Sequence, residues 1–291
     1  KVSRIYDEDT VKKIKIGKGN VIKDGNDVAI LACGVMVNEA KIAAEQLSNY
    51  GIDACIVDMH TIKPLDGKLV LVTGASRGIG AATAKLLVKK GAHVILIART
   101  QGGLEELDDH IRRVGGKSTL VPMDLADFEK IDHIGATLFE RFGKLDGLVA
   151  NAGLLGTMGP INHITPKIWD YTMTVNVNAN WRLIRSLDPL LRQSDAGRAV
   201  FLTSSAARQQ RAFWGVYSVS KAALEMMVHT YAKEIENTQI LVNLFDPGRT
   251  RTNMRAEAYP GENPNILKTP EDVADQIVAT VLPSYSLNNQ I

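Results

Sequence analysis

The sequence predicts an α/β protein in which a doubly wound parallel sheet follows a smaller, partial β-α-β unit. Short apolar runs alternate with helix-like stretches from residue 67 onward. This alternation is typical of a parallel sheet whose two faces are both buried. A glycine-rich stretch, Thr73 to Gly80, follows the first of these runs, whereas residues 1–66 have a different pattern. We therefore divide the chain into a segment over residues 1–66 and a domain over residues 67–291.

The composition is that of an ordinary globular protein. Hydrophobic residues make up 45% of the chain and charged residues 23%, and the formal net charge is +2. Such a balance gives no reason to expect nucleic acid or an acidic membrane as a partner. No apolar run approaches the ~18 residues that a membrane helix needs. The six histidines show no metal-ligand spacing, so we expect no metal. Cys33 and Cys55 lie in apolar runs, which favours reduced thiols and a cytoplasmic protein.

The first segment contains one β-α-β pattern over residues 27–62. "DVAILACG" and "IDACIVDMHTI" are strand-like, and the stretch between them has helical spacing. Residues 1–27 are predicted to be loop. Ile16 to Asp66, and "DMHTIKPLD" in particular, resembles part of the C-terminal domain of the transketolase family. The thiamine-binding domains of that family have no counterpart here, so the resemblance implies a packing or dimerisation fragment, or a fusion. A piece that joins a transketolase-like complex is an alternative.

The second domain carries two motifs at the carboxyl ends of predicted strands. "TGASRGIG" has glycines at 74, 78 and 80 between a strand and a helix. This context is the one in which a glycine-rich turn and a helix N-terminus bind a dinucleotide pyrophosphate, as in a Rossmann-type fold. "YSVSK" places Tyr217 and Lys221 four residues apart, on one face of a helix. A nearby ammonium favours the phenolate, so we expect Lys221 to lower the pKa of Tyr217 and to prepare it for proton transfer.

Six motifs occur together in one order: "TGASRGIG", "NAG", the asparagine of "TVNVNANW", "SS", "YSVSK" and "DPGRTRT". From about residue 65 to the C-terminus, the chain resembles the classical short-chain dehydrogenase/reductase family. The resemblance implies that Tyr217 is the catalytic acid/base and that Lys221 lowers its pKa and holds the nicotinamide ribose. It implies that Asn176 belongs to a water-linked proton relay and that a serine orients the substrate oxygen. Alignment of the strand end favours Ser205, although Ser204 has the commoner spacing to Tyr217.

The resemblance also implies a cofactor site. An acidic residue after the second strand would bind the 2′-hydroxyl of NAD, but Arg99 stands at that place and Arg77 lies in the glycine-rich turn. Two guanidinium groups suit a 2′-phosphate, so we expect NADP(H). The residues expected to contact this cofactor are Gly74, Ser76, Arg77, Gly78, Ile79, Gly80, Arg99, Asp124, Leu125, Asn151, Ala152, Gly153, Tyr217, Lys221, Pro247, Gly248 and Thr252.

The function expected from this resemblance is an NADP(H)-dependent oxidoreductase. It would transfer hydride between nicotinamide and a small carbonyl or alcohol substrate, and it would form a homo-oligomer, a dimer or a tetramer. The alternative is a non-catalytic dinucleotide-binding scaffold or sensor. The loop "RQQRAFWG" should border the cleft, where Arg208, Arg211 and Trp214 would suit a substrate with a negative group and an apolar body. After the last predicted helix, "SYSLNNQI" ends where the family adds a further strand.

Overall fold

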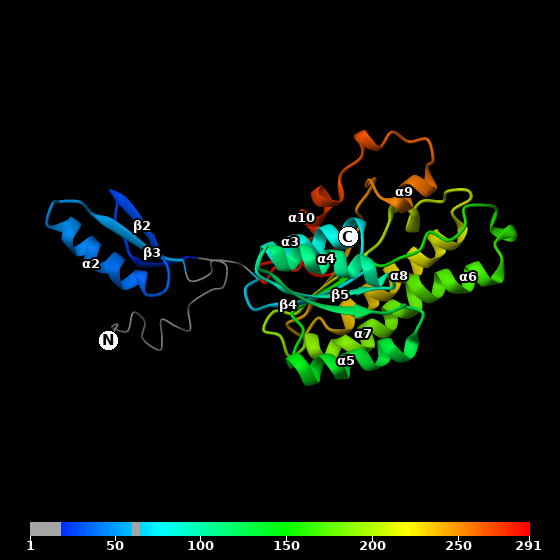
Figure 1. Ribbon diagram of the computed structural model, residues 1–291, viewed down its shortest axis with the longest axis horizontal. Coiled ribbons are helices and arrows are strands. Elements are labelled where there is room, and N and C mark those ends of the chain that lie inside the picture. Colours follow the sequence, from blue (N-terminus) through cyan, green and yellow to red (C-terminus); the bar gives the residue numbers. More distant parts are fainter. Residues whose placement is uncertain (1–18, 60–64) are drawn as a thin grey trace. The chain divides into compact units, whose positions relative to one another are not determined.

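A computed structural model describes residues 19–59 and 65–291 of the chain. Contacts divide the chain into two compact units, Lys1–Asp66 and Gly67–Ile291 (Figure 1). Residues 60–64, which contain part of "DMHTIKPLD", lie outside the described residues. In the part that the structure describes, no helix is long and apolar enough to cross a membrane.

The first unit is a small sheet covered by one helix. Strands β2 (Val28–Ala32) and β3 (Ala54–Asp58) are parallel and are joined through helix α2 (Met36–Ser48), as the sequence predicts. The structure corrects one expectation, because Asn20–Lys23 is a strand, β1, and not loop. It pairs antiparallel with β3. Strand β1 is only four residues long and is interrupted by a register shift. Its alternation of apolar and polar residues is therefore too short to predict a strand from the sequence.

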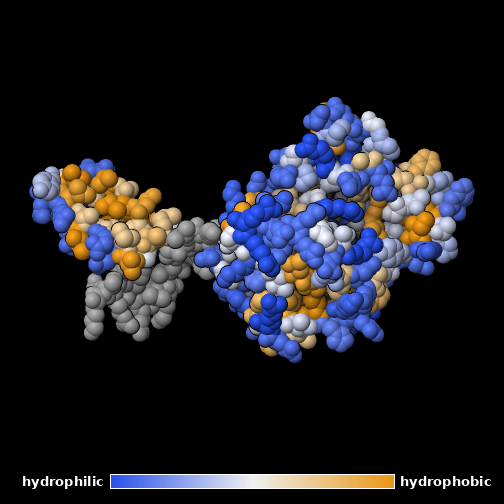
Figure 2. Space-filling model, in the orientation of Figure 1, coloured by the Kyte–Doolittle hydropathy of each residue, from blue (hydrophilic) through white to orange (hydrophobic). Residues whose placement is uncertain are grey.

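One face of this small sheet packs on α2, and the described side chains of the other face are partly or fully exposed. Ala54 and Ile56 of β3 are buried against Ala40 and Ala44 of the helix. Since side chains alternate along a strand, the residues between them point away from α2. Leu31 is 66% exposed. Apolar surface is visible on this unit in Figure 2.

The second unit is built on a six-stranded parallel sheet in the order β6-β5-β4-β7-β8-β9. Its strands are β4 (Leu69–Thr73), β5 (His93–Ala98), β6 (Lys117–Pro122), β7 (Gly147–Ala150), β8 (Arg198–Leu202) and β9 (Leu241–Phe245). The chain builds outward from β4 in one direction and then from β7 in the other. This doubly wound order confirms the predicted Rossmann-type fold and places the ligand crevice where the order reverses, at the carboxyl ends of β4 and β7.

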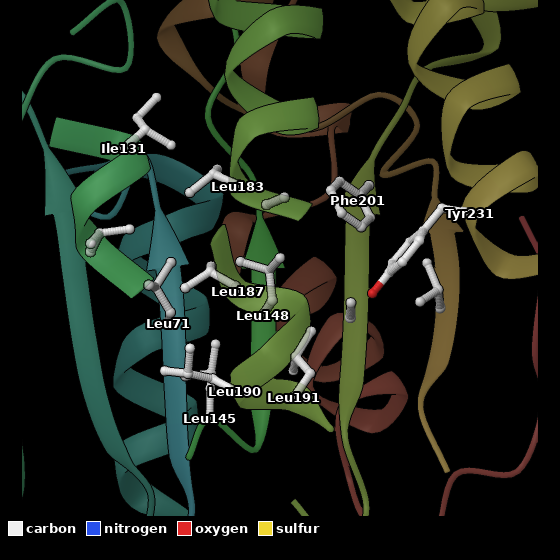
Figure 3. Packing of buried hydrophobic residues seen from close by; sticks show 14 of the residues in the cluster. Leu71, Ile131, Leu145, Leu148, Leu183, Leu187, Leu190, Leu191, Phe201 and Tyr231 are labelled. Carbon is white, nitrogen blue, oxygen red and sulfur yellow. The ribbon is translucent and has the colours of Figure 1, made fainter. Parts of the chain in front are cut away.

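Helices cover both faces of this sheet. The long helices are α3 (Gly78–Lys89), α4 (Gln101–Arg113), α5 (Phe128–Phe142), α7 (Ala179–Leu191), α8 (Gly215–Glu234) and α10 (Pro270–Thr280). Helices α5, α7 and α8 share one apolar cluster with the strands. Figure 3 shows Leu71 of β4 beside Leu187 of α7, and Phe201 of β8 nearer to Tyr231 of α8. Helix α10 packs on α3. Burial on both faces explains why the strands are almost continuously apolar.

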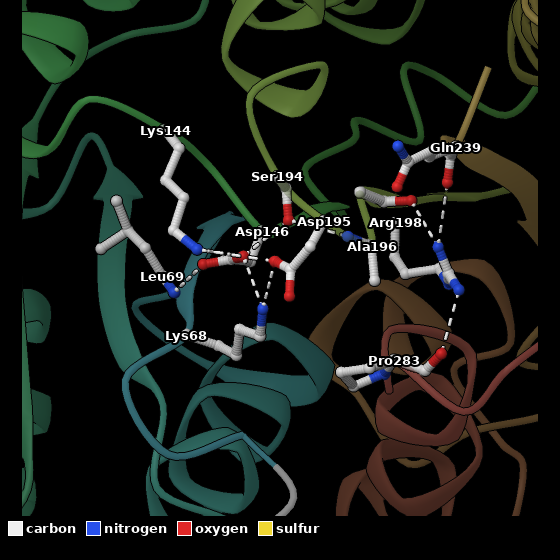
Figure 4. A network of polar contacts seen from close by, with 11 residues as sticks. Lys68, Leu69, Lys144, Asp146, Ser194, Asp195, Ala196, Arg198, Gln239 and Pro283 are labelled. Atoms are coloured by element: carbon white, nitrogen blue, oxygen red, sulfur yellow. Dashed lines mark hydrogen bonds and ion pairs between the residues drawn. The ribbon is translucent and has the colours of Figure 1, made fainter. Parts of the chain in front are cut away.

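Buried charges tie together the amino ends of β4 and β7, at the opposite edge from the crevice. Asp146 accepts hydrogen bonds from Lys68 Nζ at 3.1 Å, from the Leu69 N–H at 2.9 Å and from Ser194 Oγ at 2.6 Å (Figure 4). Burial opposes ionisation of Asp146, but the hydrogen bonds from Ser194 and Leu69 and the charge of Lys68 lower its pKa overall. The network holds the two strands whose far ends form the crevice.

The C-terminal tail covers the outer edge of β9. The Asn289 N–H donates to the Val242 carbonyl, and the Leu244 N–H donates to the Gln290 carbonyl, each at 2.8 Å. From the sequence, we expected this tail to end where a further strand would begin. Instead, the tail supplies hydrogen-bond partners for the backbone in the middle of β9. An edge strand without such partners would present a row of unpaired donors and acceptors.

Candidate functional site

A cavity of about 630 Å³ opens at the carboxyl ends of β4 to β9. The structure brings most of the predicted site residues to its walls, from loops far apart in the sequence. They are Gly74, Ser76, Arg77, Gly78, Ile79, Arg99, Asp124, Leu125, Asn151, Ala152, Gly153, Tyr217, Lys221, Pro247 and Thr252. Four predicted residues, Gly80, Asn176, Ser205 and Gly248, are not part of this lining.

The glycine-rich turn leaves no space for side chains. Gly74 has a φ of +66°, and a Cβ there would lie 2.8 Å from Asn151 Nδ2. A Cβ on Gly80 would lie 2.3 Å from the Gly74 carbonyl oxygen. Asn151 fastens the turn by donating to the Thr73 carbonyl at 2.9 Å. Gly80 is therefore outside the cavity lining, and its lack of a side chain allows the turn to close.

The helix that follows this turn presents its first N–H groups without a side-chain cap. Arg77 is the N-cap residue of α3 and makes no side-chain capping hydrogen bond. Uncapped N–H groups and the helix dipole form a favourable site for an anion. The closed glycine turn and the open helix end therefore fit a pyrophosphate.

A cluster of three side chains lies at the ends of β5 and β6. Arg99 Nη1 donates to the Tyr171 hydroxyl at 2.7 Å, and that hydroxyl donates to Asp124 Oδ2 at 3.2 Å. Arg99 also lies 3.9 Å from the Asp124 carboxylate. Tyr171, on helix α6 (Pro166–Met173), was not predicted, although it lines the cavity. Its place in the sequence carries no motif, and only the fold brings it to Arg99.

Tyr217 lies near the start of α8 and is 8% exposed. Burial raises its pKa to about 12, although a hydrogen bond with the Ser204 side chain opposes that rise. This contact favours Ser204 over the expected Ser205. Ser204 is still extended and accepts a hydrogen bond from the Ala206 N–H at 3.2 Å, whereas Ser205 already begins the 3₁₀ turn η3 (Ser205–Ala207). The early turn separates the two hydroxyls, because Ser204 precedes it and Ser205 lies within it.

Lys221 follows one helical turn later and is also buried. Its Nζ donates to the Leu202 carbonyl, at the end of β8, at 2.7 Å. Burial lowers its pKa to about 8, against the opposing charges of Asp246 and Glu225. The expectation that the ammonium leaves Tyr217 with a lowered pKa does not hold in this structure, because burial penalises the phenolate more than its surroundings favour it.

Asn176 lies in a π-helical turn, η2 (Thr174–Asn178), and is fully buried. Its Oδ1 accepts from the Leu154 N–H, and its Nδ2 donates to the Leu154 carbonyl, both at 2.8 Å. A second Nδ2 hydrogen bond goes to Ser220 Oγ at 2.9 Å. The side chain thus joins the turn to the loop after β7 and to α8. Single π turns often occur at functional sites.

The turn after β9 closes the far side of the cavity. Gly248 adopts a φ of +66°, and its N–H donates to Asp246 Oδ1 at 2.9 Å. Pro247 and Thr252 line the cavity. Thr252 caps the short helix α9 (Asn253–Ala258) by accepting from the Arg255 N–H. Arg208, expected to meet substrate, is instead held in ion pairs with Glu225 and with Asp246.

These residues correspond to a known family. Residues 68–263 match the family model of the short chain dehydrogenases. The uncharacterized oxidoreductase YciK of Escherichia coli strain K12 is 41% identical over 212 residues, covering 72% of this chain and 84% of that protein. The chain therefore belongs to the short chain dehydrogenase family. The match leaves the first unit outside.

Solved structures agree in fold. A short chain dehydrogenase from Shigella flexneri, in complex with NADP, superposes with a TM-score of 0.75 at 38% identity, covering 78% of this chain and 97% of that one. Another, from Escherichia coli CFT073 in complex with NADPH, superposes with a TM-score of 0.73 at 37% identity, covering 78% and 96%. Within the described residues, no group of three or more His, Cys, Asp or Glu side chains is placed to hold a metal ion.

The tight packing of the glycine-rich turn can be tested with a matched pair of glycine-to-alanine substitutions. We predict that Gly80→Ala lowers the free energy of unfolding by about 1–3 kcal/mol, because the added methyl meets backbone 2.3 Å away. Gly102→Ala, in α4 with nothing within 4 Å, should raise it by about 0.5–1 kcal/mol, since alanine favours a helix. Urea denaturation followed by circular dichroism measures both. Equal stability of the two variants would contradict the description of the turn.

Proposed function

We propose that the protein is an NADP(H)-dependent oxidoreductase that interconverts a small carbonyl compound and its alcohol, with Tyr217 as the acid/base. One observation carries the proposal: buried Tyr217 and Lys221 line the same cavity as the glycine-rich turn and the open end of α3. A phenol, an ammonium and an anion site are the parts that hydride transfer to a carbonyl needs from the protein.

Two cationic side chains in the cavity support the choice of NADP(H) over NAD(H). Arg77 and Arg99 line the cavity where an acidic residue would favour NAD. Arg99 is half-exposed and held by Tyr171. A guanidinium group grips a phosphate with two hydrogen bonds. The structures from Shigella flexneri and Escherichia coli that hold NADP and NADPH support the same choice.

Bound NADPH would supply the hydride that reduces the carbonyl carbon, leaving NADP⁺. The protein supplies the proton. With a pKa of about 12, Tyr217 is protonated at neutral pH and can give its proton to the carbonyl oxygen as the alcohol forms. Ser204 then forms a hydrogen bond with the Tyr217 oxygen, which has lost its proton. Lys221, which is cationic below about pH 8, stabilises the resulting phenolate.

A non-catalytic dinucleotide-binding scaffold is the alternative. Burial penalises the charged form of Lys221 enough to lower its pKa to about 8 and raises that of Tyr217 to about 12. A scaffold gains nothing from two such groups in its ligand cavity, whereas strongly shifted pKa values are expected where protons are transferred. The burial of both groups in one cavity therefore supports the enzyme better.

For the first unit we retain the hypothesis of a packing or dimerisation element that resembles part of a transketolase C-terminal domain. Its parallel β2 and β3 with α2 between them are the support. The proposed reaction uses none of its residues, because every proposed group belongs to the second unit.

The role of Tyr217 is tested by removing one oxygen atom. We predict that Tyr217→Phe lowers kcat for carbonyl reduction by at least about 100-fold, the usual contribution of a general acid. Binding of NADPH, followed by its fluorescence, should change little. Tyr285→Phe makes the same change outside the cavity lining and should keep the native rate. Equal rates for native protein and Tyr217→Phe would refute the proposed proton donor, and NADPH binding without turnover of any carbonyl would favour the scaffold.

Tyr171 gives a test of the phosphate end. Its hydroxyl bridges Arg99 and Asp124, which are otherwise 3.9 Å apart, so Tyr171→Phe should let Arg99 move closer to the carboxylate and away from a 2′-phosphate. We predict that the Kd for NADPH rises about tenfold, the value of a hydrogen bond to a charged group. The Kd for NADH should stay within about twofold, since NADH has no such phosphate. Fluorescence titration measures both, and Arg99→Ala serves as the positive control. A parallel rise for both cofactors would contradict this role.

A further inference from the structure

An apolar cluster surrounds the reacting phenol. Tyr217 is buried with Leu155 and Ala206. Four half-buried side chains pack against these three, and they are Met158, Trp214, Met254 and Ala258. Leu155 and Met254 also line the cavity beside Tyr217. The cavity wall beside Tyr217 therefore includes hydrocarbon and thioether groups, and Trp214 packs on the same cluster without being part of the cavity lining.

The backbone turns Trp214 toward the phenol. Phe213, just before it, has a φ of +71°, which is costly for a bulky residue. Phe213 is also 59% exposed, so its own packing does little to offset that cost. The Gly159 N–H donates to the Phe213 carbonyl at 2.9 Å, and Gly159 forms a bridge with Trp214. The strained backbone of Phe213, held by these contacts, indicates that the position of Trp214 is constrained.

Trp214 forms a continuous aromatic wall with two tyrosines. Its ring centroid lies 5.8 Å from that of Tyr217, at an angle of 61° between the planes. It also lies 5.8 Å from the ring of Tyr259, which follows α9. Arg211 Nη1 donates to the Tyr259 hydroxyl at 3.2 Å. The wall thus extends from the reacting phenol to the segment that closes the cavity mouth.

The arginines nearest this wall are already engaged. Arg208 pairs with Glu225 and Asp246, as described above. Arg255 is bound by Glu262 through two hydrogen bonds of 2.5 and 2.6 Å, and it stacks on the ring of Tyr259. Arg211 donates to Gln209 and to the Tyr259 hydroxyl. Glu225, Asp246 and Glu262 therefore compete with an anionic substrate for Arg208 and Arg255. Arg211 is held by uncharged oxygens and stacks over the Trp214 ring, 5.6 Å from its centroid.

We propose that the substrate is an uncharged carbonyl compound with a flat apolar group, such as an aromatic ring, which lies against Trp214. This inference rests on the proposed function. Burial of a ring against apolar side chains is favourable in proportion to the area removed from water, and aromatic pairs at these separations add to it. A carboxylate would lose its water shell against these apolar side chains.

Three aldehydes distinguish the alternatives: benzaldehyde, 4-carboxybenzaldehyde and glyceraldehyde, each reduced with NADPH by the full chain. We expect kcat/KM for benzaldehyde to exceed that for either of the others by tenfold or more. Trp214→Ala should lower kcat/KM for benzaldehyde about tenfold, mainly through KM, and should leave glyceraldehyde within twofold. Trp214→Phe should restore most of the loss. Phe139→Ala removes an exposed ring of α5 that lies outside the cluster around Tyr217 and serves as the matched control.

Two results would overturn the inference while leaving the proposed function intact. One is 4-carboxybenzaldehyde reduced as well as or better than benzaldehyde. The other is an equal loss for all three aldehydes in Trp214→Ala. If NADPH binds but no carbonyl is reduced, the proposed function fails instead. In that case calorimetry with benzamide and 4-carboxybenzamide still tests the wall, because native protein should bind benzamide more tightly and Trp214→Ala should lose that difference.

Discussion

The site depends on the burial of two ionisable side chains at one edge of a parallel sheet. Tyr217 and Lys221 lie one helical turn apart on α8, and removal from water raises the pKa of the first to about 12 and lowers that of the second to about 8. Both shifts favour the neutral forms. The Leu202 carbonyl and the charges of Asp246 and Glu225 compensate part of the cost for the lysine. Arg208, which pairs with both carboxylates, keeps them in place.

The parallel sheet places the other residues of the site at this same edge. Because all six strands run in one direction, their carboxyl ends meet at the cavity, and each contributes a loop. The loop after β4 supplies the glycine turn, and the loop after β7 supplies Asn151, which fastens that turn. The loop after β8 supplies Ser204. Asn176 then connects the loop after β7 to α8, so the glycine turn and the helix that carries Tyr217 are parts of one hydrogen-bonded structure.

Much of this could be predicted, and the exceptions have physical reasons. Strands buried on both faces leave continuous apolar runs in the sequence, so the doubly wound sheet was predictable. The glycine turn and the Tyr-Lys pair depend on local spacing, and the structure brings both to the cavity. The serine was not settled by spacing, because one residue decides whether a hydroxyl precedes or enters a 3₁₀ turn. Tyr171 carries no local signal, since only the packing of α6 places it between Arg99 and Asp124. The direction of the Tyr217 pKa was also missed, because sequence spacing shows the neighbouring charge but not the depth of burial.

The central claim is that a buried, cationic Lys221 supports a protonated Tyr217 during carbonyl reduction. The most direct test is the pH dependence of kcat/KM for the carbonyl at saturating NADPH. The lowered pKa means that Lys221 is charged below about pH 8 and becomes neutral above it, while Tyr217 stays protonated up to about pH 12. We therefore predict a plateau at lower pH and a fall above an apparent pKa near 8. A profile that stays level to pH 10 would contradict the account.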